Sequence, residues 1–194
     1  MNIVIGDKKM AILQRGNEME IKIDTLCYGA GMFVEIVWPQ LKSEIERIKK
    51  VIIKNKQALV LLPEIFLTNE FKSRFQDFFG FEPAIWHSKI TPKNKRIIWK
   101  GIIENKINLV VGARSALLLP FKKLGVIVVD EEHDTSYKQD EGVIYNARDM
   151  AISRALFEKI PIHLITSIPS VETYNNIKKK KYRHIKILKR YNNF

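Results

Sequence analysis

A run of five acidic or imidazole side chains follows four β-branched residues near the middle of the chain. Residues 126–129 read Val-Ile-Val-Val, and the polar run comes directly after them: Asp130, Glu131, Glu132, His133 and Asp134. The β-branched run predicts a strand buried on both faces, and ligands bind at the carboxyl ends of such strands. An Asp there suits a Mg²⁺ carried by a nucleotide, and the Glu after it suits orientation of an attacking water. A solvated acidic turn is the alternative, and the run alone does not decide between the two.

Strands and helices are predicted to alternate around this run. Strands are expected over residues 58–62, 84–86, 107–111, 126–129 and 162–165, each from a short apolar run. The expected helices are one after Pro39 with Leu41, Ile45, Ile48 and Ile52 on one face, one from a Thr68 cap through Phe71, Phe75, Phe78 and Phe79 to Gly80, one from Thr91-Pro92, and one over residues 147–159 with Ile152, Ala155 and Leu156 inward. Such alternation requires βαβ crossovers. The predicted class is α/β, with a mainly parallel sheet and helices on both faces.

The two ends of the chain carry weaker patterns. Residues 1–24 predict little beyond a hairpin or a loose extension, and residues 25–28 predict a short strand leading into a glycine turn at Gly29-Ala30-Gly31. Near the other end, the basic run Lys178-Lys-Lys-Lys181 with Arg183 is interpreted as a solvated helix end or linker that could touch phosphates. Nothing in that run specifies a phosphate site.

The composition narrows the class of protein. Of 194 residues, 46% are apolar, which is enough for a core. The formal net charge of +12 favours a polyanionic partner, either nucleic acid or an anionic membrane, unless it is only a compositional bias. The single cysteine, Cys27, excludes an internal disulfide and a cysteine-based zinc cluster, so zinc is not expected. The lack of a disulfide favours a reducing compartment. No apolar run approaches the roughly 20 residues of a membrane helix, and the N-terminus lacks a signal-peptide pattern, so a cytoplasmic protein without a membrane partner is expected.

Four motifs in order, from about Ala58 to the end, carry a family resemblance. They are Leu61-Leu-Pro-Glu64-Ile65 with Leu67-Thr68; Trp86-His87-Ser88; Val111-Gly112-Ala-Arg114-Ser115-Ala116-Leu117 with Pro120-Phe121; and Val128-Val129-Asp130-Glu131-Glu132-His133-Asp134, followed by Ser136-Tyr137-Lys138-Gln139, Glu141-Gly142, Tyr145 and Ala147-Arg148-Asp149. In this order and spacing they resemble primosomal protein N-prime, the PriA family of replication-restart DNA helicases in superfamily 2. The fourth motif is the most specific.

The resemblance implies a RecA-like fold of the P-loop NTPase type and the first of two motor lobes. On this basis residues 25–170 are expected to form the ATP-binding lobe, residues 1–24 an uncertain N-terminal extension, and residues 171–194 a basic segment leading towards a second lobe. The family's activity is ATP-dependent 3'-5' DNA unwinding and primosome assembly at stalled forks, in DNA replication and repair. The expected cofactor is ATP with Mg²⁺, and the expected partners are single-stranded or forked DNA and other primosome proteins.

The resemblance also assigns roles at the nucleotide site. Asp130 would bind Mg²⁺ through the nucleotide, and Glu131 would act on water. His133 would relay the nucleotide state towards the DNA contacts. Gly29 and Gly31 would belong to the nucleotide-binding turn.

A second set of residues is implied to contact DNA. They are Thr68, Arg114, Ser115, Tyr137, Lys138, Tyr145 and Arg148. In the segment from Asp134 to Asp149, the tyrosines could stack on bases, and Lys138 and Arg148 could meet phosphates. The alternatives are an ordinary polar connection, or tyrosines that pack inward and hold the loop against the sheet.

The phosphate loop departs from the family pattern. Such a loop reads G-x-x-x-x-G-K-[ST], with its lysine on the β- and γ-phosphates and its hydroxyl on Mg²⁺. Here Met32 and Phe33 stand where Lys and Ser/Thr are expected, and the third helicase motif is reduced to Thr166-Ser167-Ile168. The chain is therefore expected to be a truncated first lobe with impaired ATPase, in which Asp130 lies within about 15 Å of the glycine turn. A non-catalytic nucleic-acid-binding module and a non-functional remnant are the alternatives.

Overall fold

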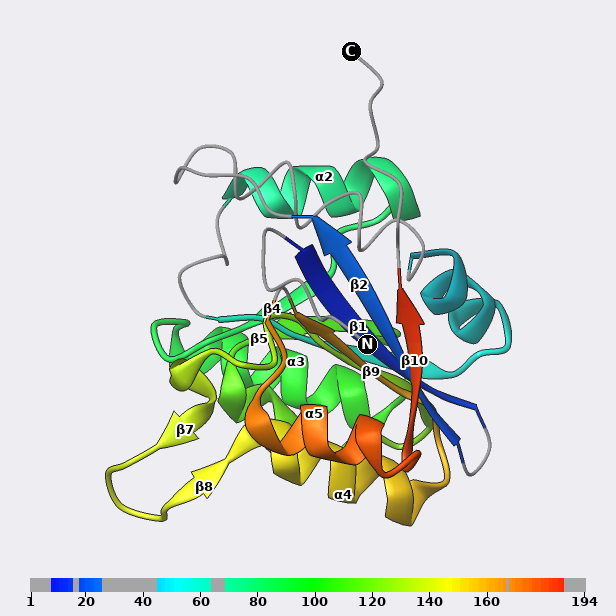
Figure 1. The fold of residues 1–194 in the computed structure, drawn as a ribbon. Coiled ribbons are helices and arrows are strands. Elements are labelled where there is room, and N and C mark those ends of the chain that lie inside the picture. The colour runs from blue at the N-terminus through cyan, green and yellow to red at the C-terminus, as the bar shows by residue number, and fades with distance from the viewer. Residues whose placement is uncertain (1–7, 16–17, 26–44, 64–68, 167, 187–194) are drawn as a thin grey trace.

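The computed structural model describes residues 8–15, 18–25, 45–63, 69–166 and 168–186 (Figure 1). Five parallel strands form one continuous part of its main sheet, with β4 at the edge: β3 (Gln57–Leu61), β4 (Ala84–Trp86), β5 (Leu109–Gly112), β6 (Leu124–Val129) and β9 (Ile162–Thr166). Their order is β9-β6-β3-β5-β4, and each neighbouring pair is parallel. The prediction of an α/β fold with a mainly parallel sheet is confirmed.

The apolar runs form strands because both faces of the sheet are covered. Every residue of β3 and β6 is buried, and successive side chains enter opposite halves of the core. Leu59 and Ile127 belong to one half, and Ala58 and Val128 to the other. Both halves of the core pack against β3 and β6, so the carboxyl ends of these two strands are supported by packed side chains on each face of the sheet.

Helices cover both faces, as predicted (Figure 1). Residues 45–53 and α2 (Asn69–Phe79) lie on one face, where Ile48 and Phe75 are buried. The other face carries α3 (Pro92–Ile103), α4 (Ala147–Glu158), α5 (Val171–Lys178) and the short 3-10 helix η2 (Arg114–Leu118). In α3 the predicted start is confirmed, because Thr91 accepts a hydrogen bond from the backbone N–H of Asn94 and Pro92 opens the helix.

The inward face of α4 is made of small residues. Ala147, Ala151 and Ala155 are fully buried at spacings of four, and Ile152 packs beside them. The prediction that Leu156 points inward is wrong, because its side chain is 60% exposed. The close approach of helix and sheet that alanines allow leaves the larger leucine on the solvent side.

Strands from both ends of the chain join the same sheet. β1 (Lys8–Arg15) and β2 (Glu18–Thr25) form an antiparallel hairpin, one of the two possibilities predicted for the N-terminal residues. β2 runs parallel to β10 (Tyr182–Lys186) and to β9. Residues 171–186 are thus a helix and a strand rather than a linker. The domain limits at residues 24 and 170 stay a prediction, since the sheet continues beyond them.

A second, small sheet lies between β6 and α4. After the short 3-10 helix η3 (Thr135–Tyr137), β7 (Lys138–Gln139) and β8 (Tyr145–Asn146) pair antiparallel and project from the body (Figure 1). Within the described residues, no helix has the length and apolar character needed to cross a membrane.

Candidate functional site

The acidic segment after β6 is buried across the ends of the neighbouring strands. Asp130, Glu131 and Glu132 are all buried. The backbone N–H of Asp130 donates to the Leu61 carbonyl at the end of β3 (3.0 Å), and that of Glu132 donates to Ile165 in β9 (2.9 Å). Glu131 has a φ of +48°, a left-handed conformation that side chains rarely adopt and that is found at functional sites. A solvated acidic turn does not fit this burial.

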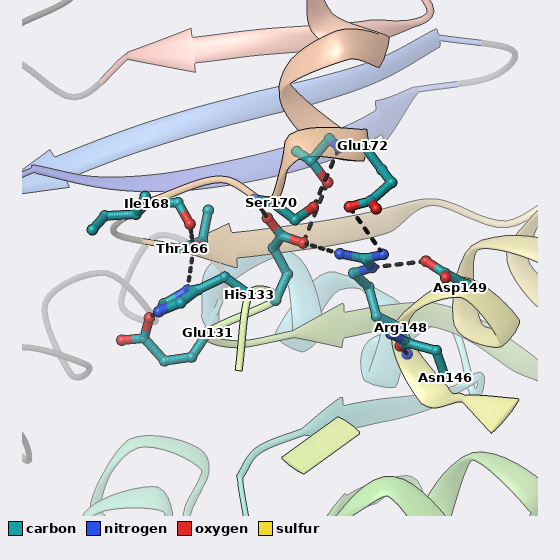
Figure 2. Close-up of polar contacts among 11 residues, drawn as sticks. Glu131, His133, Asn146, Arg148, Asp149, Thr166, Ile168, Ser170 and Glu172 are labelled. Carbon is teal, nitrogen blue, oxygen red and sulfur yellow. Dashed lines mark hydrogen bonds and ion pairs between the residues drawn. The ribbon is translucent and has the colours of Figure 1, made fainter. Parts of the chain in front are cut away.

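His133 connects the acidic segment to the chain after β9. Its Nδ1 lies 2.6 Å from Thr166 Oγ1 and 3.6 Å from Glu131 Oε2 (Figure 2). The Thr166 hydroxyl donates its single proton to the Ile168 carbonyl (2.7 Å), so Nδ1 must be the donor to Thr166. The arrangement gives His133 a defined orientation between Glu131, a predicted catalytic carboxylate, and Thr166 at the end of β9.

Glu132 is the centre of a buried polar cluster. One oxygen, Oε1, accepts from the backbone N–H of Ser170 (2.7 Å). The other, Oε2, accepts from Arg148 Nη1 (3.1 Å) and from Thr173 Oγ1 (3.3 Å). A single carboxylate thus joins the end of β6 to the first turns of α4 and α5.

Arg148 is committed to this cluster. The residue is 6% exposed, and besides Glu132 its guanidinium contacts Asp149 (2.7 Å) and Glu172 (3.8 Å) (Figure 2). Burial acts to lower the pKa of Arg148, but the hydrogen bond with Asp149 and the charge of Glu132 outweigh it and the pKa is raised. The predicted contact of Arg148 with phosphates does not suit this placement. Sequence reasoning missed Glu132, although a third carboxylate in a buried run needs a cationic partner.

Tyr137 lies in the core rather than on the surface of the loop. Its residue exposure is 1%, and its hydroxyl is 2.5 Å from the Asp130 carbonyl and 3.0 Å from the Leu61 carbonyl. Burial, followed by the charge of Asp130, raises the pKa of Tyr137 well above its ordinary value. Base stacking by Tyr137 is therefore corrected to an anchoring role: the phenol holds the loop to the ends of β3 and β6.

Replacing Tyr137 with Phe removes the hydroxyl and keeps the ring. At neutral pH the variant is expected to lose about 1 kcal/mol of unfolding free energy with the hydrogen bond. The folded protein keeps the phenol neutral above its ordinary pKa of 10.0, whereas the unfolded chain ionises it. The stability that the neutral, buried phenol contributes is therefore fully present below pH 10.0, and it is lost as the pH rises above 10.0 towards the raised pKa of the folded protein. Urea unfolding at about pH 8 and about pH 11 compares the two proteins. If both lose the same stability between these pH values, burial does not hold Tyr137 neutral.

Arg114 anchors the loop from the other side. It opens η2 just after β5, and its Nη1 donates to the carbonyls of Lys138 (2.7 Å) and Ser136 (3.3 Å). Arg114 and Ser115 are both half-exposed, so they remain reachable from solvent. The loop is thus held at two points. Arg114, a predicted DNA contact, bonds to its backbone, and the Tyr137 side chain of the loop bonds to the backbone of Asp130.

The other predicted loop residues differ in exposure. Lys138 is exposed and forms an ion pair with Asp140 (2.9 Å). Tyr145 is half-buried and packs against the core, in the manner of the inward-packing alternative. Its partial exposure leaves the base-stacking role a prediction.

Gly112 sets how closely η2 approaches the strand ends. A Cβ there would lie 2.5 Å from the Trp86 carbonyl and 2.6 Å from the Ala116 Cβ, so backbone would have to move. Gly112→Ala is expected to lower the unfolding free energy by about 1 to 3 kcal/mol. In the control, Gly101→Ala, the new Cβ meets only the Ile107 side chain, which can rotate, so the loss is smaller. Equal loss in the two variants, measured by thermal unfolding, would contradict the close-approach argument.

Several predicted residues lie outside the described part of the chain. They are Gly29, Gly31, Met32, Phe33 and Thr68. The predicted distance between Asp130 and the glycine turn accordingly stays a prediction. What the described residues bring together are Asp130, Glu131, His133, Arg114 and the loop that begins at Asp134.

The sequence is similar to known helicases. Residues 25–177 match the family model described as DEAD/DEAH box helicase. The chain is 51% identical over 142 residues to the replication restart protein PriA of Rickettsia felis, covering 73% of this chain and 22% of that protein. It is 41% identical over 153 residues to that of Bacillus subtilis (78% and 19%) and 39% identical over 154 residues to that of Haemophilus influenzae (78% and 21%). The chain spans about a fifth of the length of these relatives.

Proposed function

The chain belongs to the DEAD/DEAH box helicase family, and from that premise we propose that it is a single-strand-binding helicase lobe with an impaired nucleotide site. It resembles the ATP-binding lobe of the PriA replication restart proteins. The observation that carries the proposal is the connection between the candidate nucleotide site at Asp130 and the candidate DNA-contacting loop after β6. Through Tyr137 and Arg114, the loop after β6 is bonded both to the backbone of Asp130 and to the end of β5.

The nucleotide half of the proposal concerns Asp130 and Glu131. Helicases of this family use a nucleotide with Mg²⁺, and carboxylate oxygens at the carboxyl end of a central strand suit that ion. When bound, the Mg²⁺-nucleotide would supply the phosphoryl group that water attacks. In this chain Asp130 would hold the ion, Glu131 would orient the water, and His133 would relay the state of the site to Thr166.

Hydrolysis is proposed to be impaired because the phosphate loop lacks its working side chains. Met32 cannot supply the positive charge that a lysine places on the phosphates, and Phe33 cannot ligate Mg²⁺. Stabilisation of the negative charge in the transition state would then depend on the Mg²⁺ that Asp130 would hold, without the lysine charge, which removes a large part of the catalytic effect. Gly29 and Gly31 could still approach a phosphate with their backbone.

The DNA half of the proposal concerns Arg114, Ser115, Lys138 and Tyr145, with Thr68 on sequence grounds. Arg114 and Ser115 follow the end of β5, and Lys138 and Tyr145 lie in the loop whose backbone Arg114 holds. These exposed or half-exposed side chains suit phosphate contacts and base stacking on a single strand. The lobe is proposed to comprise residues 25–170. Unwinding of forked DNA and primosome assembly in the cytoplasm would need a second lobe, either from another part of a longer chain or from another polypeptide.

Replacing Arg114 with Ala tests the DNA half. We expect single-stranded DNA to bind about tenfold more weakly, because a phosphate contact and the loop anchor are both lost. The slope of log affinity against log salt should fall by about 0.7, as for one phosphate contact on a single strand. Fluorescence anisotropy with a labelled oligonucleotide measures both quantities. Lys54→Ala, an exposed cation before β3 at the opposite edge, is the control with the same charge change. If the two variants bind alike, the strand-end edge is not the DNA site.

A further inference from the structure

We propose that the outward face of α3 is a second nucleic-acid contact surface, which continues the DNA track from the strand ends. This surface, the α3 basic face, consists of Lys93, Arg96 and Lys100 with Ile97 and Trp99 beside them. The inference rests on the proposed function, because it extends the path of the same strand. None of these residues belongs to the nucleotide site or to the loop after β6.

The three cations form one stripe along the helix. Lys93, Arg96 and Lys100 are all exposed, and their spacings of three and four residues place them on one side of α3. Ile98 and Ile102 face the core from the other side. The stripe rises about 10 Å, which matches roughly three nucleotides of a stacked strand at about 3.4 Å each.

The charges on this face are only slightly compensated. The first turn of α3 has no acidic residue, and Lys100 meets Glu104 at 3.7 Å in an exposed pair, which is a weak interaction. Among the residues that the structure describes, neither Lys93 nor Arg96 forms an ion pair. A polyanion is therefore the partner that the face complements, in a chain whose net charge is +12.

Trp99 adds a feature that an ordinary solvated helix does not need. Trp99 is 44% exposed, whereas Trp86 in β4 is 9% exposed. Ile97 is also exposed, on the opposite flank of the stripe. An exposed indole beside cations suits stacking of a base whose phosphates meet the cations. This combination favours a single nucleic-acid strand over an acidic protein segment, which would use the charges without an aromatic platform.

The position of α3 connects it to the edge marked by Arg114. β4 and β5 are parallel neighbours, with Trp86 opposite Gly112, so α3 and η2 both begin at the carboxyl ends of these strands. The backbone N–H of Ala113 donates to Trp86 (2.9 Å), which fixes the two ends side by side. A strand that crosses Arg114 can therefore continue along α3, away from the nucleotide site.

Binding of oligothymidylates of two lengths, about 6 and about 20 nucleotides, tests the inference. Lys93→Ala/Arg96→Ala is expected to weaken binding of the long oligonucleotide about tenfold and to lower its salt slope by about 1.4, two contacts at about 0.7 each. Binding of the short one should change little, because it can be held at the strand ends alone. The matched control is Lys50→Ala/Lys54→Ala, which removes the same charge from exposed residues in and just after the helix on the other face of the sheet.

Trp99 variants separate stacking from charge. Trp99→Ala should weaken binding of the long oligonucleotide about tenfold, and Trp99→Phe, which keeps a ring, should recover most of that loss. Thermal unfolding of each variant shows whether the protein stays folded. Lys93→Ala/Arg96→Ala tests the same face without disturbing packing, because both side chains are exposed. If Lys93→Ala/Arg96→Ala and the lysine control bind the long oligonucleotide alike, α3 is no part of the track, even where Arg114→Ala weakens both lengths. If wild type binds neither length, the proposed function fails together with the inference.

Discussion

Glu132→Ala is expected to lower the free energy of unfolding by about 3 to 5 kcal/mol, the usual cost of removing one partner from a buried ion pair. Among the described residues, Arg148 would keep two ion-pair partners for its buried charge, Asp149 and Glu172, and both of these are largely exposed. The backbone N–H of Ser170 and the Thr173 hydroxyl would lose their acceptor as well. Urea unfolding followed by circular dichroism measures the change.

The control variants keep the buried pair and alter its exposed partners. Asp149→Asn and Glu172→Gln should each cost no more than about 1 kcal/mol, because exposed ion pairs contribute little. The double variant Glu132→Leu/Arg148→Met should cost less than the sum of the single changes, since no uncompensated charge remains. A loss below about 1 kcal/mol in Glu132→Ala would contradict the role of Glu132 as the centre of the cluster.

The sheet could be predicted from sequence because its strands are buried on both faces. Runs such as Val126 to Val129 have no competing interpretation once short length and β-branching are combined, and the strand bounds agree within a few residues. Leu156 was harder to place, since α4 faces the sheet with Ala147, Ala151 and Ala155. Alanine occurs on both the buried and the exposed faces of helices, so the spacing of alanines does not reveal which face of a helix is buried.

The edge strands depend on partners far away in the sequence. Met19, Ile21 and Ile23 alternate with charged residues, which is a strand pattern, and β2 forms over them. The pattern does not reveal that β2 pairs with β10 near the other end of the chain. Such long-range pairing is decided by tertiary contacts, which local propensity does not contain.

At the site, residue types predicted where chemistry lies better than which way side chains point. The position of Asp130 at the end of a central strand follows from the apolar run before it. A loop with tyrosine, lysine and arginine has the same composition whether its side chains face DNA or the core. Arg148 faces the core because Glu132, 16 residues earlier, is held there, and Thr173, 41 residues beyond Glu132, completes the cluster.

The second large effect concerns turnover. Active phosphoryl-transfer enzymes turn over at roughly 1 to 100 s⁻¹, and their phosphate loops supply both a lysine and a hydroxyl. Because we propose that Met32 and Phe33 stand at those positions, we expect ATP hydrolysis at background level, with or without DNA. Asp130→Asn is the matched control, because it removes the proposed Mg²⁺ ligand and reveals any contaminating ATPase.

ATP hydrolysis by the purified chain in saturating single-stranded DNA tests the central claim most directly, provided that binding is recorded in the same sample. A helicase lobe with an impaired nucleotide site should bind the DNA in a salt-dependent manner while wild type and Asp130→Asn release phosphate at the same background rate. DNA-stimulated turnover in the range of roughly 1 to 100 s⁻¹ that disappears in Asp130→Asn would contradict the account, because it would require a working phosphate loop in this chain.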